Sequence, residues 1–134
     1  MAQALSGAEV IRLGSLAPIR DLNWVGDTVA GMIALADADG VDGLTVNLGR
    51  GDGVSVGDLA GMILKLCGSQ ARVETDPARV RPDASEVFNL VCDSALALKT
   101  LGWIPLVSLE KGLEMTMGWM KDNLRLYKPG IYNV

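Results

Sequence analysis

The chain has 134 residues, of which 49% are hydrophobic and 21% are charged. This length suits a single domain over residues 1–134, and this hydrophobicity excludes an intrinsically disordered chain. Twelve Lys and Arg against sixteen Asp and Glu give a formal net charge of −4, which argues against nucleic acid as a partner. The apolar stretches are too short to span a membrane, so we expect a cytoplasmic protein with no membrane partner.

Residues that usually carry chemistry are scarce. The chain contains no His, which removes the commonest general base and the commonest metal ligand. Its two cysteines, Cys67 and Cys92, form no C-x-x-C pair, and we expect both to be reduced, buried thiols. No Tyr-x-x-x-Lys pair is present either. We therefore predict no metal site and no catalytic residue in this chain.

Short strands and amphipathic helices alternate in the first half of the chain. Residues 9–13 are predicted to form a strand, and apolar residues at helical spacing predict a helix from Val25 to about Asp37. The compact apolar run 44–48 is predicted to be a second strand. A longer helix should follow Ser55 and carry a buried apolar stripe.

The start and end of that longer helix have clear local signals. Ser55 is the expected N-cap, and Asp58 stands at the third helical position, as in a capping box. Gly68 is the expected residue just after the last helical turn.

In the second half, residues 71–75 are predicted to form a strand. Asp93 or Ser94 should cap a helix that runs to Leu101, and Ser108 should cap the last helix. Together these elements predict the α/β fold class: a small mixed domain of short strands and about four helices.

Two polar segments suggest ligand sites but fit none. The run Gly49-Arg50-Gly51-Asp52-Gly53 matches neither G-x-G-x-x-G nor a Walker loop, so a plain glycine turn is the better interpretation. The acidic segment 37–42 lacks the Gly and Glu positions of a calcium loop and is interpreted as a solvated helix end.

Three arginines lie in turn-rich segments beside prolines, namely Arg20, Arg79 and Arg81. The planar guanidinium group suits bidentate binding of phosphate oxygens. Most exposed arginines form only surface ion pairs. Both interpretations stay open on these residues alone.

Five segments in order resemble motifs of the NAD-dependent epimerase/dehydratase family, which are extended short-chain dehydrogenases acting on nucleotide sugars. The matching segments cover 20–29 (RDLNWVGDTV), 47–59, 79–87 (RVRPDASEV), 101–113 and the tail 126–134. The tail is similar to that of 4,6-dehydratases. The resemblance runs from about residue 9 to the last residue.

The resemblance implies the C-terminal lobe of that fold, the substrate-binding part. Relatives carry an NAD-binding Rossmann domain and a Tyr-x-x-x-Lys pair ahead of it, so we expect no NAD-binding domain, and no cofactor, in this chain. The family pattern implies diphosphate binding by Arg20 and Arg81. It also implies contact with the nucleotide base by the strand residues Ile11, Arg12, Leu13 and Gly14.

The resemblance also implies an apolar face that relatives cover with the Rossmann domain. We expect this face to be buried by self-association into a dimer, through Trp24, Phe88, Leu96 and Leu98. The predicted function is therefore a truncated or stand-alone substrate-binding lobe with weak affinity for nucleotide-sugar diphosphates, inactive alone. The alternative is half of a split NAD-dependent nucleotide-sugar 4,6-dehydratase completed by a partner chain.

Overall fold

The computed structural model describes residues 1–130, and the last four residues of the resembling tail lie outside that range. The described chain divides into two compact units, each treated separately below. Unit 1 comprises residues 1–18, 55–88 and 113–130, and unit 2 comprises 19–54 and 89–112. Within residues 1–130, no helix has the length and hydrophobicity needed to cross a bilayer. The α/β class is confirmed.

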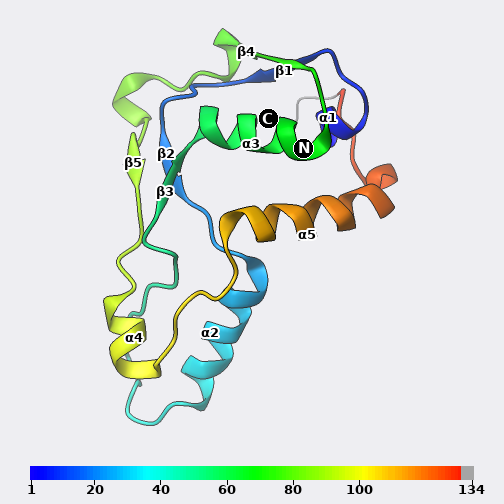
Figure 1. Cartoon of the computed structure of the whole chain (residues 1–134). Helices are drawn as coiled ribbons and strands as arrows, with labels where there is room; N and C mark the ends of the chain where they lie inside the picture. The colour runs from blue at the N-terminus through cyan, green and yellow to red at the C-terminus, as the bar shows by residue number, and fades with distance from the viewer. Residues whose placement is uncertain (131–134) are drawn as a thin grey trace. The chain divides into compact units, whose positions relative to one another are not determined.

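Unit 1 is built on a pair of parallel strands, β1 (Val10–Leu13) and β4 (Arg72–Thr75) (Figure 1). Their register sets Val10 opposite Arg72 and Leu13 opposite Thr75. Both strands agree with the prediction to within a residue. The short helix α1 (Ala2–Leu5) was not predicted, and it packs against α3 (Val56–Cys67).

Helix α3 begins and ends where its local signals predicted. The Ser55 hydroxyl oxygen accepts the backbone N–H of Asp58 at 3.0 Å, and the hydroxyl donates to the Asp58 carboxylate at 2.6 Å. The backbone N–H groups of Val56 and Gly57, the first two residues of the helix, donate to the carbonyls of Pro18 and Leu16, respectively. Gly68 follows the last turn with a φ of 64°, a left-handed conformation that favours glycine.

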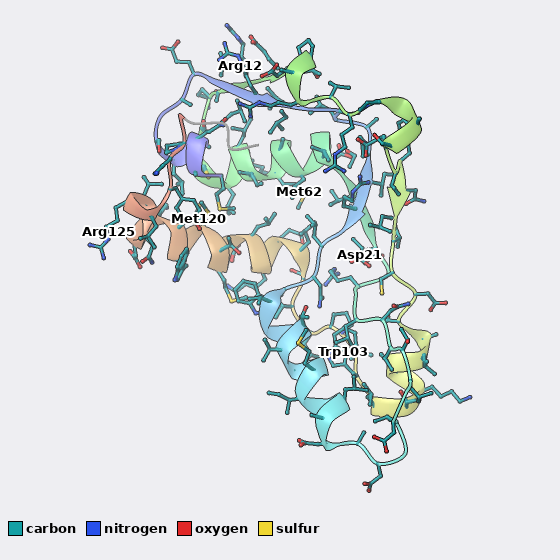
Figure 2. The ribbon with its side chains drawn as sticks, turned by 180° about the vertical axis from the view of Figure 1, so that it is seen from behind. Arg12, Asp21, Met62, Trp103, Met120 and Arg125 are labelled. Carbon is teal, nitrogen blue, oxygen red and sulfur yellow. The ribbon has the colours of Figure 1, made fainter. Side chains whose placement is uncertain are left out.

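Leu59 and Ile63 of the apolar stripe of α3 line a small cavity of about 140 Å³ against β1 and β4. Met62 points away from these strands (Figure 2). The prediction of a buried stripe is wrong in degree, because Leu59, Met62, Ile63 and Leu66 are half-buried. The buried residue of α3 is Ala60.

Helix α5 (Leu109–Asp122) starts at Ser108, whose hydroxyl oxygen accepts the N–H of Lys111 at 3.2 Å, as predicted. Its first residues belong to unit 2 and the remainder to unit 1. In unit 1, Met120 is buried. The Trp119 ring instead meets the Tyr127 ring edge-on, with centroids 6.3 Å apart.

Unit 2 contains a three-stranded sheet in the order β3 (Gly53–Ser55), β2 (Ile19–Asp21), β5 (Asn89–Leu90), with β2 and β5 parallel. The R-D segment therefore forms a strand, which the sequence analysis did not predict. The predicted strand 44–48 is wrong, since these residues form no strand. An extended apolar run becomes a strand only where a neighbouring backbone completes its hydrogen bonds.

The core of unit 2 lies between α2 (Val25–Asp37), α4 (Ala95–Leu101) and Trp103. The indole N–H of Trp103 donates to the carbonyl of Asp27 at 2.9 Å, and the Trp103 side chain is 7% exposed. Figure 2 shows Trp103 beside α2. Both helices have the predicted bounds, and α4 is followed by Gly102 at a φ of 64°.

Candidate functional site

A cavity of about 320 Å³ in unit 1 lies along β1, the strand expected to contact a nucleotide base. Ile11, Arg12 and Leu13 all line it. The Arg12 side chain is exposed and points away from α3 (Figure 2). The structure thus brings together three of the four residues that the family pattern assigned to the base.

The fourth residue, Gly14, has a packing role. A Cβ atom at Gly14 would lie 2.4 Å from the carbonyl oxygen of Arg79, so only glycine allows the two backbones to approach this closely. This approach brings the Arg79 side chain to β1, where its guanidinium donates to the carbonyl of Arg12 at 2.8 Å.

Arg79 is held in place by a local ion pair. Its Nε atom lies 3.2 Å from the carboxylate of Asp76, which also accepts the N–H of Ala78 and so shapes the turn at Pro77–Arg79. Both side chains are mostly buried. The guanidinium therefore lines the cavity in a fixed orientation.

The cavity has further polar lining that sequence reasoning missed. Gln3, Tyr127 and Lys128 line it together with Arg12 and Arg79. The Gln3 Oε1 atom is buried and has no hydrogen-bond partner among the described residues. Lys128 lies far from Arg12 in sequence, and no motif links Gln3 or Lys128 to it.

The two arginines expected to bind the diphosphate fall in different units. Arg20 lies on β2 in unit 2, is half-buried, and donates from its guanidinium to the carbonyl of Ile19 at 2.8 Å. Arg81 lies in unit 1, exposed between the turns Pro77–Arg79 and Asp83–Ser85. The diphosphate role of both residues remains a prediction.

Asp21 organises the glycine loop of unit 2. Its carboxylate accepts the backbone N–H groups of Arg50 at 3.1 Å, Gly51 at 2.9 Å and Cys92 at 3.2 Å. Figure 2 shows Asp21 at the end of β2. This side chain was missed, although it directly follows Arg20 in the R-D motif.

These hydrogen bonds decide whether the glycine loop fits a dinucleotide. In a phosphate-binding loop the backbone N–H groups point at the anion. Here the amides of Arg50 and Gly51 already donate to Asp21, and Asp52 adds a second carboxylate. The loop does not fit the pyrophosphate of NAD, which agrees with its interpretation as a plain glycine turn.

Cys92 shows no sign of an activated nucleophile. Burial raises the pKa of its thiol, and the carboxylates of Asp21 and Asp93 raise it further. A reactive cysteine needs the opposite change, toward a thiolate at neutral pH. Both cysteines are free and half-buried, so the expectation of two fully buried thiols is wrong in degree.

The four predicted interface residues differ in exposure. Phe88, Leu96 and Leu98 are exposed, in agreement with an apolar surface. Trp24 is half-buried, because its side chain packs beside Gly112, where a Cβ atom would lie 3.5 Å away. Whether any of them forms an interface remains a prediction.

The fold matches a class of proteins: the sugar-nucleotide epimerases and dehydratases. The family model described as GDP-mannose 4,6 dehydratase matches residues 1–116. The chain therefore belongs to the GDP-mannose 4,6 dehydratase family, among the NAD-dependent epimerases and dehydratases that its motifs resemble.

Individual relatives agree. GDP-L-fucose synthase 1 from Arabidopsis thaliana is 33% identical over 122 residues, covering 90% of this chain and 36% of the relative. An epimerase from Methanothermobacter thermautotrophicus superposes with a TM-score of 0.83 at 30% identity, covering 92% of this chain and 36% of that one. UDP-glucose 4-epimerase from Thermotoga maritima, solved with UDP-glucose, superposes with a TM-score of 0.80 at 28% identity. The match covers 92% of this chain and 38% of the epimerase chain. The chain spans about a third of the length of the curated relatives it matches.

Proposed function

We propose that this chain is a nucleotide-sugar-binding lobe that holds its ligand without converting it. The observation that carries the proposal is the cavity along β1, which Arg12 and Lys128 line together with Arg79, whose charge is paired with Asp76. A nucleoside diphosphate matches this lining, since its anionic oxygens suit guanidinium and ammonium groups.

The family pattern assigns the phosphates to Arg20 and Arg81 and the base to Ile11, Arg12, Leu13 and Gly14. Neither Arg20 nor Arg81 lines the cavity along β1, so their roles are separate parts of the proposal and are tested separately. A lobe that encloses only part of its ligand loses preorganisation. We therefore expect weak binding, with a dissociation constant of about 1 mM or above.

The test is a titration of the 15N-labelled chain with UDP-glucose and with GDP-mannose, followed by NMR. Amide shifts should concentrate at Ile11–Gly14 and around Arg20 and Arg81. Replacing Arg12 or Arg81 by Ala should weaken binding about tenfold, the effect of losing one charge-assisted hydrogen bond. Arg125→Ala is the matched control, because Arg125 is exposed and does not line the cavity. The absence of any shift at several millimolar ligand would overturn the proposal.

The same proposal includes self-association and no turnover by the chain alone. Large exposed apolar side chains are numerous for a chain of this length, and contiguous apolar patches on soluble proteins usually mark interfaces. Purified protein given NAD and a nucleotide sugar should release no product.

The alternative is half of a split NAD-dependent nucleotide-sugar 4,6-dehydratase. It is favoured by the family model over residues 1–116, which is described as GDP-mannose 4,6 dehydratase. Mixing this chain with a separately produced NAD-binding domain of a family member tests it. Turnover by the mixture, and by neither part, would establish the alternative.

A further inference from the structure

Arg79, the first arginine of the segment 79–87, directs its guanidinium group at other parts of unit 1. Its Nε atom lies 3.2 Å from the Asp76 carboxylate, and its Nη1 atom donates to the Arg12 carbonyl at 2.8 Å. The Arg79 and Asp76 side chains are only 21% and 25% exposed. The positive charge is therefore already paired, and the planar guanidinium joins two partners that the single ammonium of a lysine reaches less well.

The carbonyl that Arg79 binds lies on the edge of β1 that faces away from β4. The backbone N–H of Asp76, directly after β4, donates to the carbonyl of Leu13 at 2.7 Å. Successive carbonyls along a strand point to opposite edges, so the carbonyl of Arg12 points the other way. Within residues 1–130 the sheet has no third strand, and the Arg79 side chain satisfies this carbonyl instead.

The backbone of the turn that carries Arg79 is fixed to the same end of β1. The bond from Asp76 to Leu13 ties the start of the turn to the strand. The close approach of Gly14 to the carbonyl oxygen of Arg79 ties its end. Residues 12–14 are thus held between β4 and this turn, and they are three of the four residues that the family pattern assigns to the nucleotide base.

We propose that Arg79 is a positioning residue for nucleotide binding. It holds residues 12–14 in the conformation that receives the ligand, and it leaves the anionic oxygens to other cations of the cavity. The inference rests on the proposed function and assigns a role within the same cavity. A strand that is fixed before the ligand arrives lowers the ordering cost of binding. The competing role, direct contact with phosphate, needs the charge that Asp76 pairs.

Two conservative substitutions separate these roles in 15N NMR titrations with UDP-glucose and GDP-mannose. Arg79→Lys keeps the charge but loses the planar fork, so it should weaken binding about tenfold if Arg79 positions β1. A lysine would preserve most of a direct phosphate contact. Asp76→Asn should weaken binding about threefold, because Arg79 loses its charged anchor. If Arg79 bound phosphate itself, the same change would release its charge and tighten binding.

A second ion pair in unit 1 supplies the matched control. The Nε atom of Arg72 lies 2.7 Å from the Glu74 carboxylate on β4, and both side chains are more exposed than those of Arg79 and Asp76. Neither Arg72 nor Glu74 lines the cavity along β1. Arg72→Lys and Glu74→Gln should therefore leave the dissociation constants for both nucleotide sugars unchanged.

Amide hydrogen exchange without ligand gives a readout that a general loss of stability would not reproduce. In Arg79→Lys, exchange should rise about tenfold at Leu13, because β1 loses one charge-assisted hydrogen bond at its outer edge. Exchange in α3 should stay unchanged. Thermal melts check that every variant is folded at the temperature of the titrations, where a lower stability by itself does not alter the dissociation constant.

The outcomes distinguish this inference from the proposed function. Unchanged binding by Arg79→Lys, or tighter binding by Asp76→Asn, would overturn the positioning role and leave the proposed function standing. Exchange that rises equally in β1 and α3 would also overturn it, since Arg79 would then stabilise unit 1 as a whole. An unmodified chain that shows no shifts at several millimolar ligand would overturn the proposed function, and this role of Arg79 with it.

Discussion

Helices α2 and α3 are of nearly equal length and similarly apolar, yet they use their side chains in opposite ways. Leu59 and Ile63 of the α3 stripe line a cavity against the strands of unit 1, and the N-terminus of α3 is capped by Ser55 and two backbone carbonyls. The stripe of α2 faces water, and the helix is held through Asp27 and Gly31 on its other side. The comparison shows that an apolar stripe predicts a helix but does not predict which segment, if any, covers the stripe.

The largest expected effect comes from the anchor on the buried side of α2. Trp103→Ala should lower the free energy of unfolding by about 4 kcal/mol, since it removes a buried aromatic ring and its hydrogen bond. Trp103→Phe keeps most of the ring and should cost about 1–2 kcal/mol, for the carbonyl of Asp27 left without its donor. Urea denaturation measures both. Equal losses in the two variants would mean that the hydrogen bond, and not the ring, holds α2.

An isoleucine on each helix tests the comparison directly. Ile63→Ala on α3 should cost about 2 kcal/mol, because Ile63 lines the small apolar cavity against the strands. Ile33→Ala on α2 should cost less than about 0.5 kcal/mol in dilute protein, because its side chain is already 56% exposed. A large loss for Ile33→Ala in dilute solution would contradict the exposed stripe.

The helix caps give a smaller effect. Ser55→Ala should cost about 1 kcal/mol, the usual value for losing a side-chain N-cap. Ser94→Ala at the start of α4 is the control, since the Ser94 side chain makes no capping bond, and it should change stability by less than about 0.3 kcal/mol. Thermal unfolding of the pair is the measurement, and equal effects would remove the cap as the cause.

The smallest effects differ in sign. Gly31→Ala should destabilise by about 1 kcal/mol, because the new methyl group meets Leu48 and the Trp103 indole. Gly61→Ala on α3 meets no atom within 4 Å and should stabilise by about 0.5–1 kcal/mol through helix propensity. If both variants were stabilised, the close packing behind α2 would be relaxed in solution.

Local signals made much of the fold predictable. Ser55 and Asp58 lie one turn apart, and Gly68 and Gly102 stand directly after their helices, so each signal acts within a few residues. The motifs likewise identified the family, because they are short and occur in order. For the site, β1 was predicted to face a ligand, and three of its residues do line a cavity.

Other features depended on residues distant in sequence. The run 44–48 has the composition of a strand but pairs with no strand within the described residues 1–130. Gln3 and Lys128 reach the β1 cavity from opposite ends of the chain, and Asp21 holds a loop about thirty residues away. No periodicity or motif in a single sequence predicts contacts between residues that lie so far apart along the chain.

The amino-acid sequence by itself determined where helices α2, α3 and α4 begin and end, the family, and the absence of histidine, because these depend on near neighbours or on composition alone. Tertiary structure decided which face of α2 is buried, which apolar run is left without a partner strand, and which cations share a cavity. The physical reason is that burial and strand pairing are contacts between distant segments, whose outcome depends on what else the folded chain places beside them.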